Sequence, residues 1–167
     1  SAMIGTSKLL PGEVSLAHNG ILFLDELAEY RRDVLESLRT PLEDGEIRLT
    51  RAMGQASFPS RCTLIAAVNP CPCGWRFHPD KICRCSQVQL QRYASKLSGP
   101  ILDRIDLHIW VEPITTGQFF DETDIEKSIS IRNRVQLCRA KQTTRYKDST
   151  FRCNADLQGK ALWEHCR

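Results

Sequence analysis

An apolar run followed by two adjacent acids, Gly20-Ile-Leu-Phe-Leu-Asp-Glu-Leu27, is the feature that most constrains how this chain can fold. Four consecutive apolar residues predict a strand of a parallel sheet, because helices cover both faces of such a strand. The two acids then stand at its carboxyl end, where ligands bind in open α/β sheets. Asp25 can hold the magnesium of a nucleotide, and Glu26 can polarise a water that attacks a phosphate. The alternative is a strand followed by the solvated start of a helix.

Two further segments predict neighbouring strands. The run Cys62–Val68 is apolar enough to be a second buried parallel strand, and Leu107–Val111 predicts a third. Asn69 follows the second run, and its side-chain amide can hydrogen-bond a phosphate or orient a water. An Asn-Pro pair is equally typical of a simple turn.

Helical patterns separate these strands, so we expect an α/β fold. One helix is predicted over Ala28–Arg39, with Pro41 ending it because the residue before a proline is pushed out of the helical region. Another is predicted over Ser86–Leu97, with Ser86 as the cap. A long amphipathic helix is predicted over Asp121–Tyr146.

Residues 46–58 predict a β-hairpin that projects from the sheet. Glu46–Arg51 alternates polar and apolar residues, and a turn at 52–54 leads into Gln55–Phe58. The alternation places Arg48 and Thr50 on one face of the hairpin, and Ile47 and Leu49 on the other.

Four of the eight cysteines form two Cys-x-Cys pairs, Cys71 with Cys73 and Cys83 with Cys85. Crowding of this kind without a secretory signal favours a metal over disulfides. Four thiolates can bind one structural zinc ion, which would fold a loop with little apolar content of its own. His78 is a possible substitute ligand, and disulfides or free thiols are the alternatives.

The net charge of +3 is unevenly distributed, with +7 over residues 127–167 and −4 over residues 1–126. The basic segment could contact nucleic acid or an acidic partner, whereas the simpler interpretation is a solvated helix face. No apolar run approaches the roughly 20 residues of a membrane span. We therefore expect a cytoplasmic protein without a membrane contact.

Five segments, taken in chain order, closely resemble the magnesium-chelatase-like AAA+ ATPases of the ComM/YifB type. They are Pro11–Gly20, Leu22–Glu26, Pro41–Gly45, Asn69–Gly74 and Leu97–His108. The resemblance covers residues 4 to about 145. It implies that residues 4–115 are part of an AAA+ P-loop NTPase core with a hairpin insertion, and that residues 116–167 are a linker and the start of a helical lid. Residues 1–3 are expected to be an expression scar.

The resemblance also implies roles for single residues. Asp25 and Glu26 match the Walker B pair, Asp25 for Mg²⁺ and Glu26 for the attacking water, and Asn69 matches the sensor 1 residue. Arg104 matches the arginine finger that reaches the nucleotide of a neighbouring subunit, which in known cases is worth about 10³–10⁵ in rate. The alternative for Arg104 is an ion pair with Asp103 or Asp106.

The hairpin resembles an insertion that contacts DNA in the pore of related ring helicases. Arg48 and Arg51 are then the candidate contacts, made to phosphates rather than to bases. Alternatively, these arginines are edge charges that discourage pairing with another strand.

The phosphate-binding Walker A motif is absent from the sequence, and we expect it upstream. A second sensor arginine is expected downstream. The chain then resembles a fragment of a hexameric-type ring ATPase that uses ATP, Mg²⁺ and a structural Zn²⁺, and the fragment alone should not hydrolyse ATP. The expected activity is DNA translocation or branch migration. The alternatives are a subunit that drives metal insertion and a zinc-stapled binding module without enzymatic activity.

Overall fold

The computed structural model describes residues 2–6, 8–97, 99–113 and 126–165. The chain divides into two compact units, Ser1–Pro113 and Ile114–Arg167. The elements of the first unit are α1 (Glu13–Leu16), β1 (Ile21–Leu24), η1 (Leu27–Glu29), α2 (Arg32–Ser37), α3 (Arg39–Asp44), β2 (Glu46–Arg51), β3 (Gly54–Pro59), β4 (Thr63–Ala66), α4 (Gln87–Lys96) and α5 (Gly99–Leu102). Its mixture of helices with parallel strands is that of an α/β fold.

Two parallel strands form the centre of the first unit. β1 pairs with β4, with Leu22 opposite Leu64. Leu22 and Leu24 are buried in the apolar core of this unit, whereas Ile21 and Phe23 on the other face are 64% and 58% exposed. The predicted strand is confirmed, but the expectation that both faces are covered is wrong for the described part of the chain.

The predicted helix Ala28–Arg39 is wrong, because the structure forms three short helices, η1, α2 and α3, across and beyond it. Pro41 does not end this segment but lies at the third position of α3. The first turn tolerates proline, because its N–H groups have no partner within the helix. Gly45 ends α3 instead, with the positive φ of 67° that favours glycine at this position.

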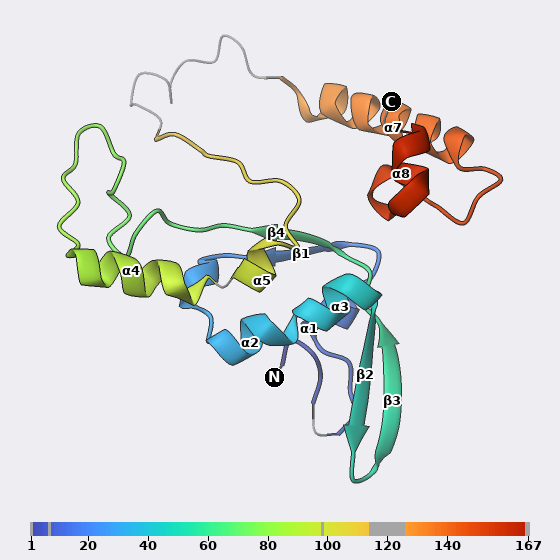
Figure 1. Ribbon diagram of the computed structural model, residues 1–167, viewed down its shortest axis with the longest axis horizontal. Helices are drawn as coiled ribbons and strands as arrows, with labels where there is room; N and C mark the ends of the chain where they lie inside the picture. The colour runs from blue at the N-terminus through green and yellow to red at the C-terminus, as the bar shows by residue number, and fades with distance from the viewer. Residues whose placement is uncertain (1, 7, 98, 114–125, 166–167) are drawn as a thin grey trace. The chain divides into compact units, whose positions relative to one another are not determined.

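A single apolar core holds the strands, the helices and the hairpin of this unit together. Its buried members are Val14, Leu22, Leu24, Leu27, Leu35, Leu38, Ile47, Leu49 and Ile101. The hairpin pairs β2 with β3, with Arg48 opposite Ser57, and projects from the rest of the unit in Figure 1. Ile47 and Leu49 enter the core while Arg48 and Thr50 are exposed, so the predicted two-faced hairpin is confirmed.

Truncation of a core leucine should destabilise the first unit. Leu38 has no exposed surface, so Leu38→Ala leaves a cavity and should lower the free energy of unfolding by about 2–5 kcal/mol. The measurement is urea denaturation followed by circular dichroism. Leu16→Ala is the matched control, because Leu16 is 68% exposed and its truncation should change stability by less than about 0.5 kcal/mol. Equal effects of the two substitutions would contradict this description of the core.

The predicted helix after the cysteine-rich segment is confirmed as α4. Ser86 caps it, since its hydroxyl accepts from Gln89 N at 3.3 Å and its own N–H donates to Gln89 Oε1 at 2.8 Å. The third strand predicted at Leu107–Val111 is wrong within the described residues, where this segment pairs with no strand. Its apolar side chains Leu107, Ile109 and Val111 are largely exposed.

The second unit consists of α7 (Ser128–Arg145), η2 (Asn154–Asp156) and α8 (Gly159–His165) in its described part. No residue of α7 is buried, so the apolar face of the predicted amphipathic helix covers no core within the described residues. The predicted start of this helix lies outside the described residues. Tyr146 is buried and its ring contacts those of Phe151 and His165. Among the helices that the structure describes, none combines the length and apolarity that crossing a bilayer requires.

Candidate nucleotide site and cysteine cluster

Asp25 and Glu26 are exposed and follow β1 directly. The Glu26 N–H donates to Asp25 Oδ1 at 2.9 Å, and Glu26 has left-handed backbone angles, φ 49° and ψ 48°. Both acids line a shallow depression of about 260 Å³ together with Glu29 and Tyr30. The structure therefore places both predicted acids at one surface site.

Asn69 lies beyond the end of β4, at the same edge of the strand pair, because β1 and β4 are parallel. The pairing continues past the strands: Ala67 N donates to Leu24 O at 2.9 Å, and Leu27 N donates to Ala67 O at 3.0 Å. The hydroxyl of Tyr93 in α4 donates to the main-chain oxygen of Asn69 at 3.1 Å. Burial raises the pKa of Tyr93, so the phenol remains a donor at neutral pH.

The chemistry of this edge suits a magnesium-bound phosphate. Carboxylate oxygens such as those of Asp25 and Glu26 are the ligands that Mg²⁺ prefers. The side chain of Asn69 is exposed, so its amide is available to a phosphate oxygen or a water. The donor set of the chain therefore fits the cofactor that the sequence predicts.

Arg104 does not line this depression and makes a different set of contacts. Its guanidinium forms an ion pair with Glu43 of α3 and donates to Pro100 O at 3.2 Å. Its side chain is 26% exposed. The ion-pair partner is thus Glu43, rather than the Asp103 or Asp106 that the sequence suggested.

The two hairpin arginines differ in how firmly they are held. Arg48 donates from Nε at 3.0 Å and from Nη2 at 2.8 Å to Glu46 Oε2. Ser57 also donates to the Glu46 carboxylate, and with Arg48 it lowers the pKa of that group. Arg51, beside the turn, donates to the main-chain oxygen of Thr50 at 2.8 Å. The charge of Arg48 is therefore matched within the hairpin, while the described contact of Arg51 is to a neutral carbonyl.

The four predicted cysteine ligands come together in one cluster. One Sγ atom from each of Cys71, Cys73, Cys83 and Cys85 lies within 4.8 Å of the others. The structure describes them as free thiols, so it does not contain the disulfides considered above. His78 is not a member of the cluster, since its Nδ1 accepts from Asp80 N at 3.1 Å.

The thiols of this cluster ionise unequally. The pKa of Cys73 is lowered to about 6, chiefly because the main-chain N–H of Trp75 donates to its sulfur. Desolvation and the neighbouring sulfurs raise the pKa of Cys85 to about 12. One thiolate therefore makes the next harder to form, because like charges at this distance repel.

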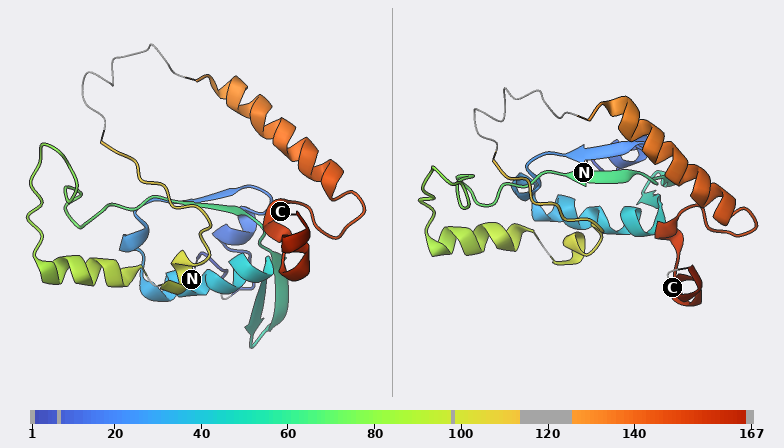
Figure 2. Two further views of the ribbon diagram at one scale, coloured as in Figure 1. Left: turned by 45° about the horizontal axis from the view of Figure 1, so that its top comes forward. Right: turned by 90° about the horizontal axis from the view of Figure 1, so that it is seen from above.

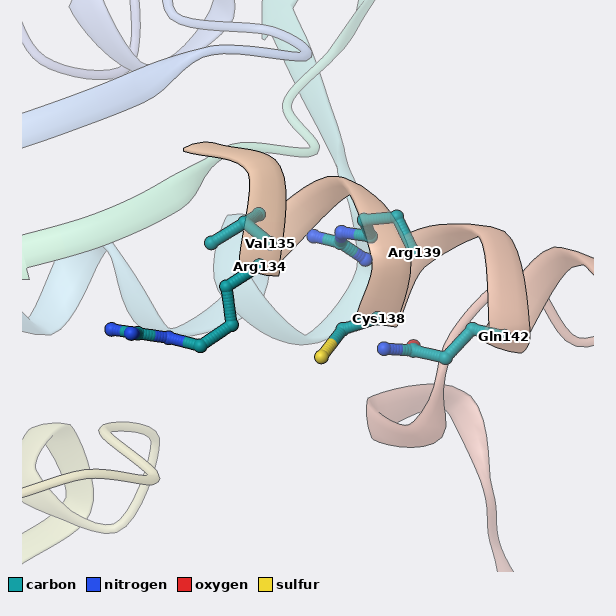
Figure 3. Close-up of a pocket in the computed structure, with 5 residues that line it drawn as sticks. All are labelled: Arg134, Val135, Cys138, Arg139 and Gln142. Carbon is teal, nitrogen blue, oxygen red and sulfur yellow. The ribbon is translucent and has the colours of Figure 1, made fainter. Parts of the chain in front are cut away.

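A second depression, of about 350 Å³, lies on α7 and is lined by Arg134, Val135, Cys138, Arg139 and Gln142 (Figure 3). Arg134, Cys138 and Gln142 extend from the same side of the helix, as their four-residue spacing requires. Arg134 is already paired with Glu126, at 2.6 and 3.1 Å. This surface offers less unmatched positive charge than its sequence suggests.

Sequence reasoning missed two partners of predicted site residues, Tyr93 and Glu43. Tyr93 donates to the main-chain oxygen of Asn69 from 24 positions away, and Glu43 of α3 pairs with Arg104. Neither contact leaves a local pattern in the sequence, because each depends on how separate helices pack.

Comparison with known proteins gives a consistent result. The family model described as magnesium chelatase, subunit ChlI, matches residues 1–119. The competence protein ComM of Haemophilus influenzae is 43% identical over 158 residues, 94% of this chain and 30% of that protein. The uncharacterised protein YifB of Escherichia coli is 38% identical over 170 residues, 100% of this chain and 32% of that protein. An uncharacterised protein of Mycobacterium tuberculosis is 46% identical over 158 residues, 95% of this chain and 31% of that protein. The chain thus spans about a third of the length of these relatives.

Proposed function

Because the chain belongs to the family of magnesium chelatase subunit ChlI, we propose that it is part of a ring-forming AAA+ ATPase whose hydrolysis of ATP is coupled to movement on DNA, as translocation or branch migration. The exposed hairpin arginines Arg48 and Arg51 support the link to DNA, and one relative is named a competence protein. In this proposal residues 4–115 belong to the ATPase core, and the helices after residue 116 begin its lid.

The observation that carries the proposal is the pair of acids in one depression at the carboxyl edge of parallel strands. This is the edge at which α/β sheets bind ligands. The alternative, an ordinary solvated helix start, predicts no second polar group at this edge. Asn69 nevertheless lies there, after the neighbouring strand, and Tyr93 donates a hydrogen bond to its main-chain oxygen.

Each of the four predicted site residues has a distinct role in this proposal. Asp25 would hold the Mg²⁺, which neutralises charge on the phosphates when it is bound. Glu26 would accept a proton from the attacking water as that water is oriented. Asn69 would hydrogen-bond the terminal phosphate or the water. Arg104 would act on the nucleotide of a neighbouring subunit, so ring formation would complete the site.

The test is the ATPase activity of the full-length protein, measured with and without DNA. We expect Mg²⁺-dependent hydrolysis that single- or double-stranded DNA stimulates. Hydrolysis that neither form of DNA stimulates would favour the metal-insertion alternative, to which the name of the family points. Absence of nucleotide binding would leave only a binding module.

The hairpin gives a sharper prediction about DNA. Arg51→Ala in the full-length protein should weaken DNA binding for all sequences alike and reduce the slope of log affinity against log salt by about 1. Arg48→Ala should have a smaller effect, because Glu46 already matches its charge. Arg31→Ala is the control, since this exposed arginine pairs with Asp33 outside the hairpin. Fluorescence anisotropy at several salt concentrations measures these effects, and equal losses for Arg31→Ala and Arg51→Ala would contradict a specific role for the hairpin.

A further inference from the structure

The separations within the cysteine cluster are those of sulfur atoms around one tetrahedral ion. Cys71 Sγ lies 3.4 Å from Cys73 Sγ and 3.7 Å from Cys83 Sγ, and the last two sulfurs are 3.6 Å apart. A tetrahedral ion with metal–sulfur bonds of about 2.3 Å requires sulfur atoms about 3.8 Å apart. A disulfide would require about 2.05 Å. The side chains are thus already arranged around a common centre.

Main-chain N–H groups support the sulfurs from outside. The N–H of Trp75 donates to the Cys73 sulfur, that of Cys85 to the Cys83 sulfur, and that of Cys73 to the Cys85 sulfur. Such outer hydrogen bonds orient metal ligands and stabilise their charge. The turn that begins the cluster is closed by Gly74 N donating to Cys71 O at 3.0 Å, and Gly74 has a φ of 78°, which favours glycine.

Burial of apolar side chains contributes little to the shape of the loop that carries the cluster. Cys71 is its one buried residue among those described between positions 70 and 86, while Phe77 and Ile82 are largely exposed. Figure 2 shows this connection leaving β4 and returning at α4 as an extended loop. Its apolar burial is too small to offset the conformational entropy of ordering so many residues.

We propose that Cys71, Cys73, Cys83 and Cys85 bind one Zn²⁺ and that this site fixes the connection between Asn69 and α4. Four thiolates select soft metals, and a closed set of four protein ligands is typical of structural zinc. The ligands stand at both ends of the loop: Cys71 is two residues after Asn69, and Cys85 directly precedes the cap residue Ser86. Zinc therefore joins the end of β4 to the start of α4, and Tyr93 of α4 makes the second link to Asn69. The site stands independently of the proposed ATPase activity.

Metal content is the first test. The chain purified under reducing conditions with zinc in the medium should contain one Zn²⁺ per molecule by elemental analysis. Cys85→Ala should lose most of this zinc, and Cys85→His should retain it, because imidazole is also a zinc ligand. Cys138→Ala is the matched control, since Cys138 lies on α7 and should leave the zinc content unchanged. Four freely titrating thiols with no bound metal in the unsubstituted chain, or iron in place of zinc, would overturn the assignment.

Proteolysis tests whether zinc fixes the loop between Asn69 and α4, and its readout does not depend on ATPase activity. Arg76, Lys81 and Arg84 are exposed sites for trypsin within the loop. Removal of zinc with a chelator should accelerate cleavage at these sites at least tenfold, while cleavage on α7 should not change. Circular dichroism of the same samples reports whether the rest of the chain stays folded. Identical cleavage rates at Arg76 and Lys81 with and without zinc would overturn the anchoring role.

Discussion

Glu26→Gln in the full-length protein is expected to reduce the rate of ATP hydrolysis by about 10²–10⁴-fold, while nucleotide binding is retained. The substitution keeps the shape of the side chain but removes its ability to accept a proton from the attacking water. In the proposed function Asp25 would still hold Mg²⁺, so a fluorescent nucleotide should bind with near-normal affinity. Single-turnover hydrolysis and nucleotide titration measure the two effects separately.

Glu29→Gln is the matched control for this experiment. Glu29 lines the same depression as Glu26, but its carboxylate already forms an ion pair with Lys96 at 3.1 Å. We therefore expect its substitution to leave hydrolysis within a few-fold of the unsubstituted protein. Full hydrolysis by Glu26→Gln, or equal losses for the two variants, would show that the depression is acidic without being catalytic.

Arg104→Ala is expected to reduce ATP hydrolysis by about 10³–10⁵-fold in the assembled protein, the range known for arginine fingers. The expectation needs a control, because Arg104 also pairs with Glu43 within its own chain. Glu43→Gln removes this ion pair and keeps the arginine. If Arg104 acts on a neighbouring nucleotide, Glu43→Gln should retain most of the activity, although its stability to urea is expected to fall.

Mixing the Arg104→Ala and Glu26→Gln variants tests whether the two residues act together at a site shared by neighbouring subunits. An Arg104→Ala subunit retains Glu26, and a Glu26→Gln subunit retains Arg104, so one kind of interface between them has both groups. Mixed assemblies should therefore recover part of the hydrolysis rate. Recovery would not occur if Arg104 only stabilised its own subunit, and an inactive mixture would thus contradict the shared site.

The parts of the structure that local pattern determines were predictable from sequence. The acids follow β1 as expected, the alternation in 46–51 sets the two faces of the hairpin, and Ser86 caps its helix. The four cysteines were close enough in sequence for their convergence to be predicted. In each case the decisive information lies within about fifteen residues.

The parts that depend on distant partners were not predictable. Leu107–Val111 has a strand-like composition, but a segment becomes a strand only when another backbone accepts and donates its hydrogen bonds. The exposure of Ile21 and Phe23 was not predictable for the same reason. Their apolar side chains suggest burial, but only the surrounding structure determines that this face of β1 is exposed in the described residues. The partner of Arg104 depended on how the segment after α5 meets Glu43 of α3, which no local spacing encodes.

The left-handed backbone of Glu26 costs folding free energy at the position where the proposed chemistry requires a carboxylate. Successive side chains of a strand point to opposite faces, so two adjacent acids can share one depression only if the chain leaves strand geometry between them. Glu26 makes that change at φ 49°, a conformation that costs a residue with a Cβ atom about 1–2 kcal/mol. Glycine would relieve this strain and would remove the carboxylate. The chain thus holds its second acid against its own conformational preference, and the surrounding core supplies the stability that keeps it there.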